Sequence, residues 1–235
     1  MNLVFGWLFH LTYQMAFSNY LLAVFLFTLV TKIILLPVSL WTQKNSIKMA
    51  SLQPRLNLLQ VKYYGDHDRI ADETAALYKE ENYHPFAGLI PMLIQIVILL
   101  GIIQVVRQPE YAGLTAEDMR LGGVRFDAYP YLAGGLYLLM PLLAGCSALL
   151  LGFAQNHLNP LQSTQSSRSQ LGTNLFSIGI SLALGAFVPT AVGFYWICSN
   201  LLTIAQQLVL NLLMNPKKLS EGTVFNWLNE FKHNA

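Results

Sequence analysis

The sequence predicts an all-α polytopic membrane protein, in which five transmembrane helices surround a hydrophilic groove. Of its 235 residues, 54% are hydrophobic and only 11% are charged, which is typical of chains that live in a bilayer. Five apolar segments are long enough, or nearly long enough, to cross a hydrocarbon core of about 30 Å. All 12 Asp and Glu residues lie outside these segments. The chain is therefore expected to cross the membrane five times.

Residues 1–20 predict an amphipathic helix that lies in the external membrane interface. His10, Gln14 and Ser18 share one helical stripe, and aromatic and aliphatic side chains occupy the rest of the surface. These residues include no Lys or Arg, so the charged beginning of a signal peptide is missing. We expect either that Met1 is the true start or that a processed leader has been removed.

The transmembrane spans follow from the runs of apolar residues. They are predicted at residues 21–41, 85–106, 131–153, 173–188 and 190–214. The fourth run is short for a bilayer and is joined to the fifth through Pro189, which favours a tight helical hairpin. Small residues recur at every fourth position of the third and fourth spans, namely Ala144, Ala148 and Gly152, and Ser177, Ser181 and Gly185. Since small residues let helix backbones approach closely, these two spans are expected to pack together.

Residues 42–84 predict a cytoplasmic helical hairpin. Apolar residues recur at helical spacing on both sides of a turn at Gly65, and Pro54 is expected to interrupt or bend the first helix. Asp66, His67 and Asp68 at the turn could be imagined as metal ligands, but no further His or Cys lies at ligand spacing. We therefore predict a solvated turn and no metal site.

The distribution of Lys and Arg predicts the orientation of the chain. Residues 42–84, 154–172 and 215–235 alternate onto one side of the membrane and hold ten Lys and Arg residues, whereas the opposite loop, 107–130, holds three. Basic residues are enriched in cytoplasmic loops. The N-terminus is therefore expected outside the cell and the C-terminus in the cytoplasm.

Composition and motifs exclude several functional classes. The net charge of +2 and the scattered basic residues do not favour nucleic acid binding. The sequence contains neither a GxxxxGK(S/T) phosphate loop nor an HExxH helix, so ATP-driven and zinc chemistry are not expected. Without carboxylates in the spans, an intramembrane aspartyl protease is excluded as well. Cys146 and Cys198 lie in apolar segments and are expected to be buried. We predict no catalytic residue and no cofactor.

Lys32 is a cation in the middle of the first span. A Lys at bilayer depth costs about 2.5–3.5 kcal/mol on insertion scales, which its apolar neighbours offset at about 0.3–0.6 kcal/mol each. No span holds an Asp or Glu that could pair with it. Ionisable residues at such depth usually face a bundle interior or a water-filled cavity and mark a functional site. The alternative is that the Lys32 side chain snorkels to the membrane interface.

Polar residues on three spans predict the lining of a hydrated groove around Lys32. They are Thr28 and Thr31 on the first span, Gln95 on the second, and Trp196, Asn200, Thr203 and Gln207 on the fifth. The four residues of the fifth span form one helical stripe, and Tyr195, Ser199 and Gln206 form the adjacent one. A polar face of that width is costly against lipid but not against water or protein. The alternative is that these side chains hold the helices together through hydrogen bonds.

Several motifs resemble those of the YidC/Oxa1/Alb3 family of membrane protein insertases. They are TKIILLP (31–37), KM (48–49), LQP (52–54), LYK (77–79), HP (84–85), PMLIQ (91–95), GFYWICSNL (193–201) and QQ (206–207). The resemblance covers essentially the whole chain, and the lack of a large external domain before the first span is similar to the Gram-positive bacterial branch. Two positions depart from the family pattern. Lys32 stands where the family usually has Arg, and Gly152 stands near a commonly polar position, with Gln155 one turn later.

The resemblance implies a hydrophilic groove that opens to the cytoplasm and to lipid but is closed outward. It also implies an insertase and membrane chaperone of the bacterial plasma membrane that catalyses no covalent chemistry. The cytoplasmic hairpin would capture a nascent hydrophobic segment, and the groove would receive its polar flank, with Lys32 attracting acidic residues. The apolar segment would then enter lipid along the third and fifth spans. The hairpin residues expected to capture clients are Met49, Leu52, Pro54, Leu56, Leu77 and Tyr78. The implied partners are nascent membrane proteins and the lipid bilayer, with the ribosome and the Sec translocon as further candidates.

Two alternatives to the insertase remain open from the sequence. One is a small-solute or anion transporter that uses Lys32 as an anion site. The lack of a recognisable internal repeat and the presence of the large hairpin argue against it. The other is an assembly chaperone without insertion activity, which sequence does not separate from an insertase.

Overall fold

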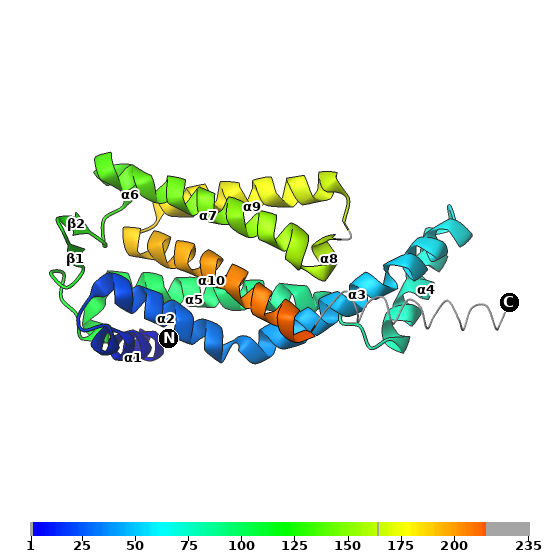
Figure 1. Ribbon diagram of the computed structural model, residues 1–235, viewed down its shortest axis with the longest axis horizontal. Helices are drawn as coiled ribbons and strands as arrows, with labels where there is room; N and C mark the ends of the chain where they lie inside the picture. Colours follow the sequence, from blue (N-terminus) through cyan, green and yellow to red (C-terminus); the bar gives the residue numbers. More distant parts are fainter. Residues whose placement is uncertain (1, 164, 215–235) are drawn as a thin grey trace.

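The computed structural model describes residues 2–163 and 165–214, which form a bundle of long helices with a helical arm at one end (Figure 1). The elements are α1 (Asn2–Met15), α2 (Tyr20–Ile34), α3 (Leu36–Lys62), α4 (His67–Glu80), the 3-10 helix η1 (Pro85–Leu89), α5 (Ile90–Arg107), η2 (Pro109–Ala112), β1 (Arg120–Leu121), β2 (Val124–Arg125), α6 (Pro130–Ala133), η3 (Gly135–Leu138), α7 (Leu139–Leu158), α8 (Pro160–Ser163), α9 (Ser167–Phe187) and α10 (Thr190–Met214). In the described part of the chain, four helices are long and apolar enough to cross a membrane, and the bent pair α2 and α3 adds a fifth crossing when counted as one span. The structure confirms the predicted all-α polytopic membrane fold.

The first predicted span, 21–41, differs from a single straight helix. α2 ends at Ile34, α3 begins at Leu36, and the two helices are bent by 57° relative to one another. Pro37 explains the break, because a proline fits the first turn of a helix but clashes with the preceding turn in a helix interior. From this point α3 runs to Lys62, with Pro54 inside it. The end of the first span and the first hairpin helix are thus one continuous helix.

The helices of the third and fourth spans do not match the predicted residues 131–153 and 173–188. α6 and η3 occupy the first residues of the third span, so α7 begins only at Leu139, whereas α7 and α9 are both longer than predicted at the ends that their connection joins. α7 continues to Leu158, and α9 begins at Ser167. The side chain of Ser166 accepts a hydrogen bond from the backbone N–H of Ser169 at 3.3 Å and so caps α9. Hydrophobicity predicts where a chain enters lipid, whereas capping decides where a helix ends. The polar ends of both helices were therefore absent from the prediction.

α7 and α9 lie side by side in the bundle, and α10 packs against both of them and against α2 (Figure 1). Ala144 and Ala148 of α7 and Ser181 and Gly185 of α9 are buried, as expected for the small-residue stripes. Cys198 is buried, but Cys146 is exposed. The reason is that Cys146 lies on the opposite face of α7 from Ala144 and Ala148.

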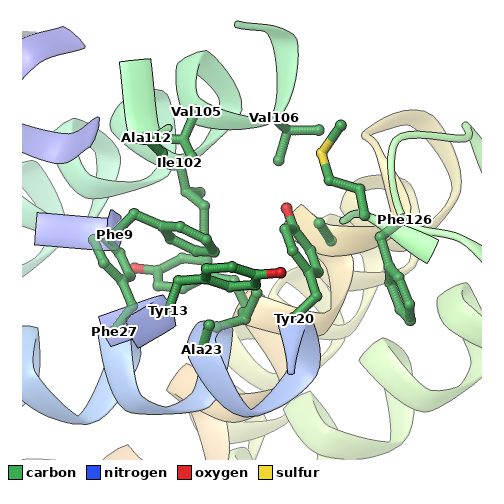
Figure 2. Close-up of a cluster of buried hydrophobic side chains, with 14 of the residues drawn as sticks. Phe9, Tyr13, Tyr20, Ala23, Phe27, Ile102, Val105, Val106, Ala112 and Phe126 are labelled. Atoms are coloured by element: carbon green, nitrogen blue, oxygen red, sulfur yellow. The ribbon is translucent and has the colours of Figure 1, made fainter. Parts of the chain in front are cut away.

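A cluster of buried aromatic and aliphatic side chains joins α1, α2 and α5 to the external loop (Figure 2). The Phe9 ring centroid lies 5.6 Å from that of Tyr20 and 5.7 Å from that of Phe27, and both Phe side chains are fully buried. Tyr20 in turn stacks on Phe126 at 5.7 Å. One face of α1 is thus part of the core, because its aromatic residues face α2 and α5 and not lipid.

The other faces of α1 contact the external loop or are exposed. The Nδ1 atom of His10 lies 2.7 Å from the carbonyl oxygen of Ala112, and Gln14 Nε2 lies 2.8 Å from His10 Nε2. Trp7 is exposed, and so is Phe17, which follows the end of α1. Within the polar stripe noted in the sequence, His10 therefore contacts the loop after α5 and Gln14 contacts His10, whereas Ser18 lies beyond the end of α1, which is Met15 and not residue 20 as predicted. The location of α1 in the membrane interface stays a prediction.

The loop between α5 and α6 contains a two-stranded antiparallel hairpin that the sequence analysis did not predict. Arg120 pairs with Arg125, and the turn residues Gly122 and Gly123 have φ values of 55° and 82°. Two glycines with positive φ suit a tight hairpin turn. The strands have two residues each, too short for an alternating pattern to be recognised.

Asp118 ties this external loop to α1. Its Oδ2 atom accepts hydrogen bonds from the backbone N–H and the hydroxyl of Thr115 at 2.7 and 2.8 Å, and the Tyr13 hydroxyl donates to Oδ1 at 3.0 Å. The hydrogen bond from the Thr115 backbone N–H is the largest cause that lowers the pKa of Asp118 below its ordinary value of 3.8, and the bond from the Thr115 hydroxyl lowers it further. A lowered carboxyl pKa stabilises the folded loop above the ordinary pKa, and this contribution is lost as the pH falls through the lowered pKa.

We therefore expect the link between α1 and the external loop to loosen when the pH falls below about 3.8. Hydrogen exchange of the Thr115 amide, followed between pH 6 and pH 3 after correction for the intrinsic exchange rate, measures this. In the control Asp118→Asn, the protection of that amide should be lower at pH 6 and should no longer change with pH. Equal pH dependence in both proteins would contradict the assignment.

Candidate functional site

Lys32 lies in the last turn of α2 and reaches across to α10. Its Nζ atom donates a hydrogen bond to Thr203 Oγ1 at 2.8 Å, and Thr203 Oγ1 donates to the carbonyl oxygen of Ser199 at 2.7 Å. The ion pairs within the described residues involve Arg55, Arg120 and Arg125, and none involves Lys32. The bundle therefore holds this cation with a neutral hydroxyl.

A cavity of about 400 Å³ lies next to Lys32. Its lining residues include several from the beginning of α3, from α8 and from the C-terminal part of α10. These segments lie at the end of the bundle from which the rest of α3 and α4 project (Figure 1). The lining residues are Lys32, Ser39, Thr42, Gln43, Ser46, Gly88, Pro91, Gln155, Asn159, Gln162, Gln165, Thr203, Gln206, Gln207 and Leu210. These residues include no Asp or Glu, and Lys32 is their one charged side chain. The cavity wall is thus polar, rich in amides and positively charged.

The structure divides the predicted groove residues into two groups. Lys32, Thr203 and Gln207 line the cavity. The other predicted lining residues, Thr28, Thr31, Gln95, Trp196 and Asn200, are not among its lining residues.

Residues of the second group make hydrogen bonds within the bundle. Gln95 Nε2 donates to the Tyr195 hydroxyl at 2.8 Å, Trp196 Nε1 to Ser181 Oγ at 2.9 Å, and Asn200 Nδ2 to Ser147 Oγ at 3.0 Å. Thr28 and Thr31 donate to carbonyl oxygens of their own helix, those of Val24 and Thr28. The polar stripe of α10 thus lines the cavity at one end of the helix and joins helices at the other, so both interpretations of the stripe apply, each to part of it.

The cavity includes residues that sequence reasoning missed. Ser39, Thr42, Gln43 and Ser46 line it from α3. Their spacing of three and four residues would place them on one helical face, but they were assigned to the end of a span and the beginning of the hairpin. Gln155 and Gln162 line it from α7 and α8, and Gln206, which the sequence placed on the polar face of the fifth span, lines it from α10. Gln155 was noted only for its position relative to Gly152.

An amide network joins α3, α7 and α10 at this cavity. Gln207 Nε2 donates to Gln43 Oε1 at 3.1 Å, and Gln43 Nε2 donates to Asn211 Oδ1 at 3.0 Å. Asn211 Nδ2 donates to the carbonyl oxygen of Leu158 at 2.6 Å. Side-chain amides can donate and accept at once, so a closed set of them fixes three helices without any charge.

The hairpin residues expected to capture clients form the core of the hairpin itself. Leu52, Leu56 and Leu77 are buried against one another, and Met49 and Tyr78 pack on them. Pro54 is half-buried in α3. These residues therefore lie mostly inside the hairpin, and their role in client capture stays a prediction. The physical reason for their burial is that two amphipathic helices bury their apolar faces against each other.

Other apolar residues of the hairpin are open to solvent. Leu58, Val61 and Tyr64 are 51%, 75% and 92% exposed. Two contacts hold the hairpin near its base: Lys48 Nζ donates to the carbonyl oxygen of Glu81 at 2.6 Å, and Arg55 pairs with the Glu81 carboxylate at 2.7 Å. At the turn, Asp66 caps α4 by accepting from the backbone N–H of Arg69 at 3.0 Å, which is the role of a helix cap.

Comparison with known proteins identifies the family. The model of the family described as "60Kd inner membrane protein" matches residues 11–218 of this chain. Membrane protein insertase YidC 2 of Listeria innocua is 26% identical over 220 residues, which cover 91% of this chain and 71% of that protein. Membrane protein insertase YidC of Francisella tularensis subsp. novicida is 31% identical over 193 residues, which cover 82% of this chain but only 32% of that protein. The chain therefore belongs to the 60Kd inner membrane protein family, the YidC/Oxa1 family of membrane protein insertases, and is a multi-pass membrane protein.

Proposed function

We propose that this chain is a membrane protein insertase and chaperone that moves nascent hydrophobic segments and their polar flanks into the bilayer through the cavity beside Lys32. The observation that carries this proposal is a cation that forms no ion pair with any described residue and lies on the wall of an amide-rich cavity, at the bundle end next to the hairpin. The family of the chain and the names of its relatives support the same function.

The cavity gives a polar flank an alternative to crossing hydrocarbon directly. A charged residue that crosses hydrocarbon costs several kcal/mol, and water-filled or thinned paths reduce that cost. Lys32 provides the positive charge that an acidic flank needs at this depth. The apolar segment can leave along α7 and α10, where Leu149, Leu150 and Leu201 are exposed on the surface of the bundle.

The proposal extends to partners and orientation. Clients are nascent membrane proteins, the bilayer receives them, and the ribosome and the Sec translocon are candidate partners. The basic loops are placed in the cytoplasm, with the N-terminus outside. Insertion by this route breaks and forms no covalent bond, so the protein acts without catalytic residues or cofactors. The small-solute or anion transporter finds no support in the family match or in the relatives named above.

Reconstitution of the purified protein into liposomes tests the proposed function. We expect a one-span client released from ribosomes to insert at least several-fold faster than into protein-free liposomes of the same lipid composition. Protease protection of the translocated flank measures insertion. A parallel assay of small-anion uptake should show no increase over protein-free liposomes. Anion uptake without client insertion would favour the transporter, and prevention of client aggregation without insertion would favour the assembly chaperone.

A further inference from the structure

We propose that the cavity binds the peptide backbone of a translocating flank through glutamine side chains, whatever the sequence of that flank. This inference rests on the proposed insertase function and identifies the chemical group that its cavity recognises. The residues assigned to this backbone site are Gln155, Gln162 and Gln206.

The first observation is that these three side chains carry buried amide atoms without partners. Gln155 Oε1, Gln162 Oε1 and Gln206 Nε2 have no hydrogen-bond partner among the described residues. The fourth such atom in the described part of the chain is the hydroxyl of Tyr20, which lies in the aromatic cluster around Phe9. Three of the four unpaired atoms thus belong to the walls of one cavity.

The second observation is that other amides of the same cavity are paired. Gln43 and Gln207 bond to each other and to Asn211, which bonds to the carbonyl oxygen of Leu158. This network joins α3, α7 and α10 and explains how the wall keeps its shape. The three unpaired amides do not share that structural task, although they come from α7, α8 and α10 around the same space.

The free energy of leaving amides unpaired points to a partner from outside the chain. A buried donor or acceptor without a partner costs about 1–3 kcal/mol. Three such costs in one cavity are offset when a molecule that enters the cavity makes the missing bonds. The three atoms are themselves covered in this structure, so rotation of the flexible Gln side chains must first turn them toward the cavity, where water or a client can make the bonds.

The chemistry of the three amides matches a peptide backbone. Two carbonyl oxygens accept hydrogen bonds and one amide nitrogen donates, and every non-proline residue of a client presents one N–H and one C=O. No lining residue is an Asp or Glu that would favour a cationic ligand. An acidic side chain can be attracted by Lys32, but many flanks have none. The backbone is present in every flank.

The site addresses a cost that every client shares. An extended flank that leaves water exposes backbone groups, and each unsatisfied group in hydrocarbon costs several kcal/mol. Side-chain amides can take over the hydrogen bonds that water made. Lys32 then favours acidic flanks, whereas Gln155, Gln162 and Gln206 accept flanks of any composition.

Backbone amide-to-ester substitution in the client tests the site directly. An ester removes the N–H donor and leaves the side chain unchanged. We compare two synthetic one-span clients with the same neutral Gly/Ser flank, one with amides and one with alternating esters. A photoreactive residue in place of Ser46, which lines the cavity from α3, reports flank occupancy by crosslinking, and protease protection reports insertion.

In the otherwise unchanged protein, we expect the ester flank to crosslink and insert about three- to tenfold less than the amide flank, which is the effect of one or two hydrogen bonds. In the triple variant Gln155→Met, Gln162→Met and Gln206→Met, amide and ester flanks should become nearly equal. The matched control is Gln165→Met, because Gln165 lines the cavity but is exposed and already accepts a hydrogen bond from Ser169 Oγ at 3.2 Å. It should keep the full preference for the amide.

Each outcome decides the assignment. Equal crosslinking of amide and ester flanks in the unchanged protein overturns the backbone site, and so does a triple variant that retains the amide preference. Should the triple variant fail to fold, Gln155→Met alone must reduce the preference by at least twofold, because Gln155 Oε1 is one of the two atoms that would accept from the client's N–H groups. Crosslinking that discriminates amide from ester without any insertion would refute the insertase function and keep the backbone site. Insertion of amide and ester flanks to equal extents would support the insertase function and refute the backbone site.

Discussion

Replacing Lys32 with Ala is expected to slow the insertion of clients with acidic external flanks by about tenfold to a hundredfold. A hydrogen bond to a charged group contributes about 1.5–3 kcal/mol, which corresponds to that range of rates. Lys32→Glu should be slower still, because a carboxylate in the same position repels the acidic flank. Lys32→Arg should retain insertion, since its guanidinium keeps the charge and can donate to Thr203.

Two controls separate the charge of Lys32 from its structural contact. Thr203→Val removes the hydroxyl that Lys32 binds but leaves the ammonium in the cavity, so insertion of acidic flanks should change by less than about threefold. A client with a neutral Gly/Ser flank should be nearly insensitive to Lys32→Ala. The quantity measured is the insertion rate into liposomes at equal amounts of folded protein. An Ala variant that inserts acidic flanks at the parent rate would show that charge attraction is not part of the mechanism.

The sequence predicted the bundle better than it predicted the joints between its helices. The polar stripe of α10 followed from spacing alone, because a helix presents residues three and four apart on one face. The bend at Leu35 was not predicted, although Pro37 is present in the sequence, because the run of apolar residues continues across the bend. The short hairpin at Gly122 and Gly123 was missed because a two-residue strand carries no recognisable pattern.

For the candidate site, the sequence indicated polarity but not pairing. Thr203 and Asn200 are equally polar on one stripe, yet Thr203 binds Lys32 at the cavity and Asn200 binds Ser147. Whether Thr203 or Asn200 lines the cavity depends on which neighbouring helix lies opposite that residue along α10. In the hairpin, Leu52 and Leu77 were correctly placed on apolar faces, but periodicity does not tell whether two such faces meet each other or a client. These distinctions arise from tertiary contacts.

Gly185→Ala is expected to lower the free energy of unfolding by about 1–3 kcal/mol, the usual cost of forcing extra atoms into a packed contact. A Cβ atom at Gly185 would lie 2.5 Å from the Cα atom of Pro141 and 3.0 Å from the Cβ atom of Ala144. The Cα atom of Pro141 belongs to the backbone, so a change of side-chain rotamer cannot make room for the added Cβ atom. α7 and α9 would have to separate, and Gly185→Val should be more severe than Gly185→Ala.

The matched control lies on the same helix. Gly179 has open space around its Cα atom, with nothing within 4 Å of an added Cβ. Alanine has a higher helix propensity than glycine by about 1 kcal/mol, so Gly179→Ala should be neutral or slightly stabilising, and the same gain partly offsets the clash at Gly185. Thermal unfolding in detergent compares the two variants with the parent. Separation of α7 from α9 should also disturb α10, because Trp196 bonds to Ser181 of α9 and Asn200 bonds to Ser147 of α7. If Gly185→Ala were as stable as Gly179→Ala, the close approach of α7 and α9 would not be what holds this side of the bundle together.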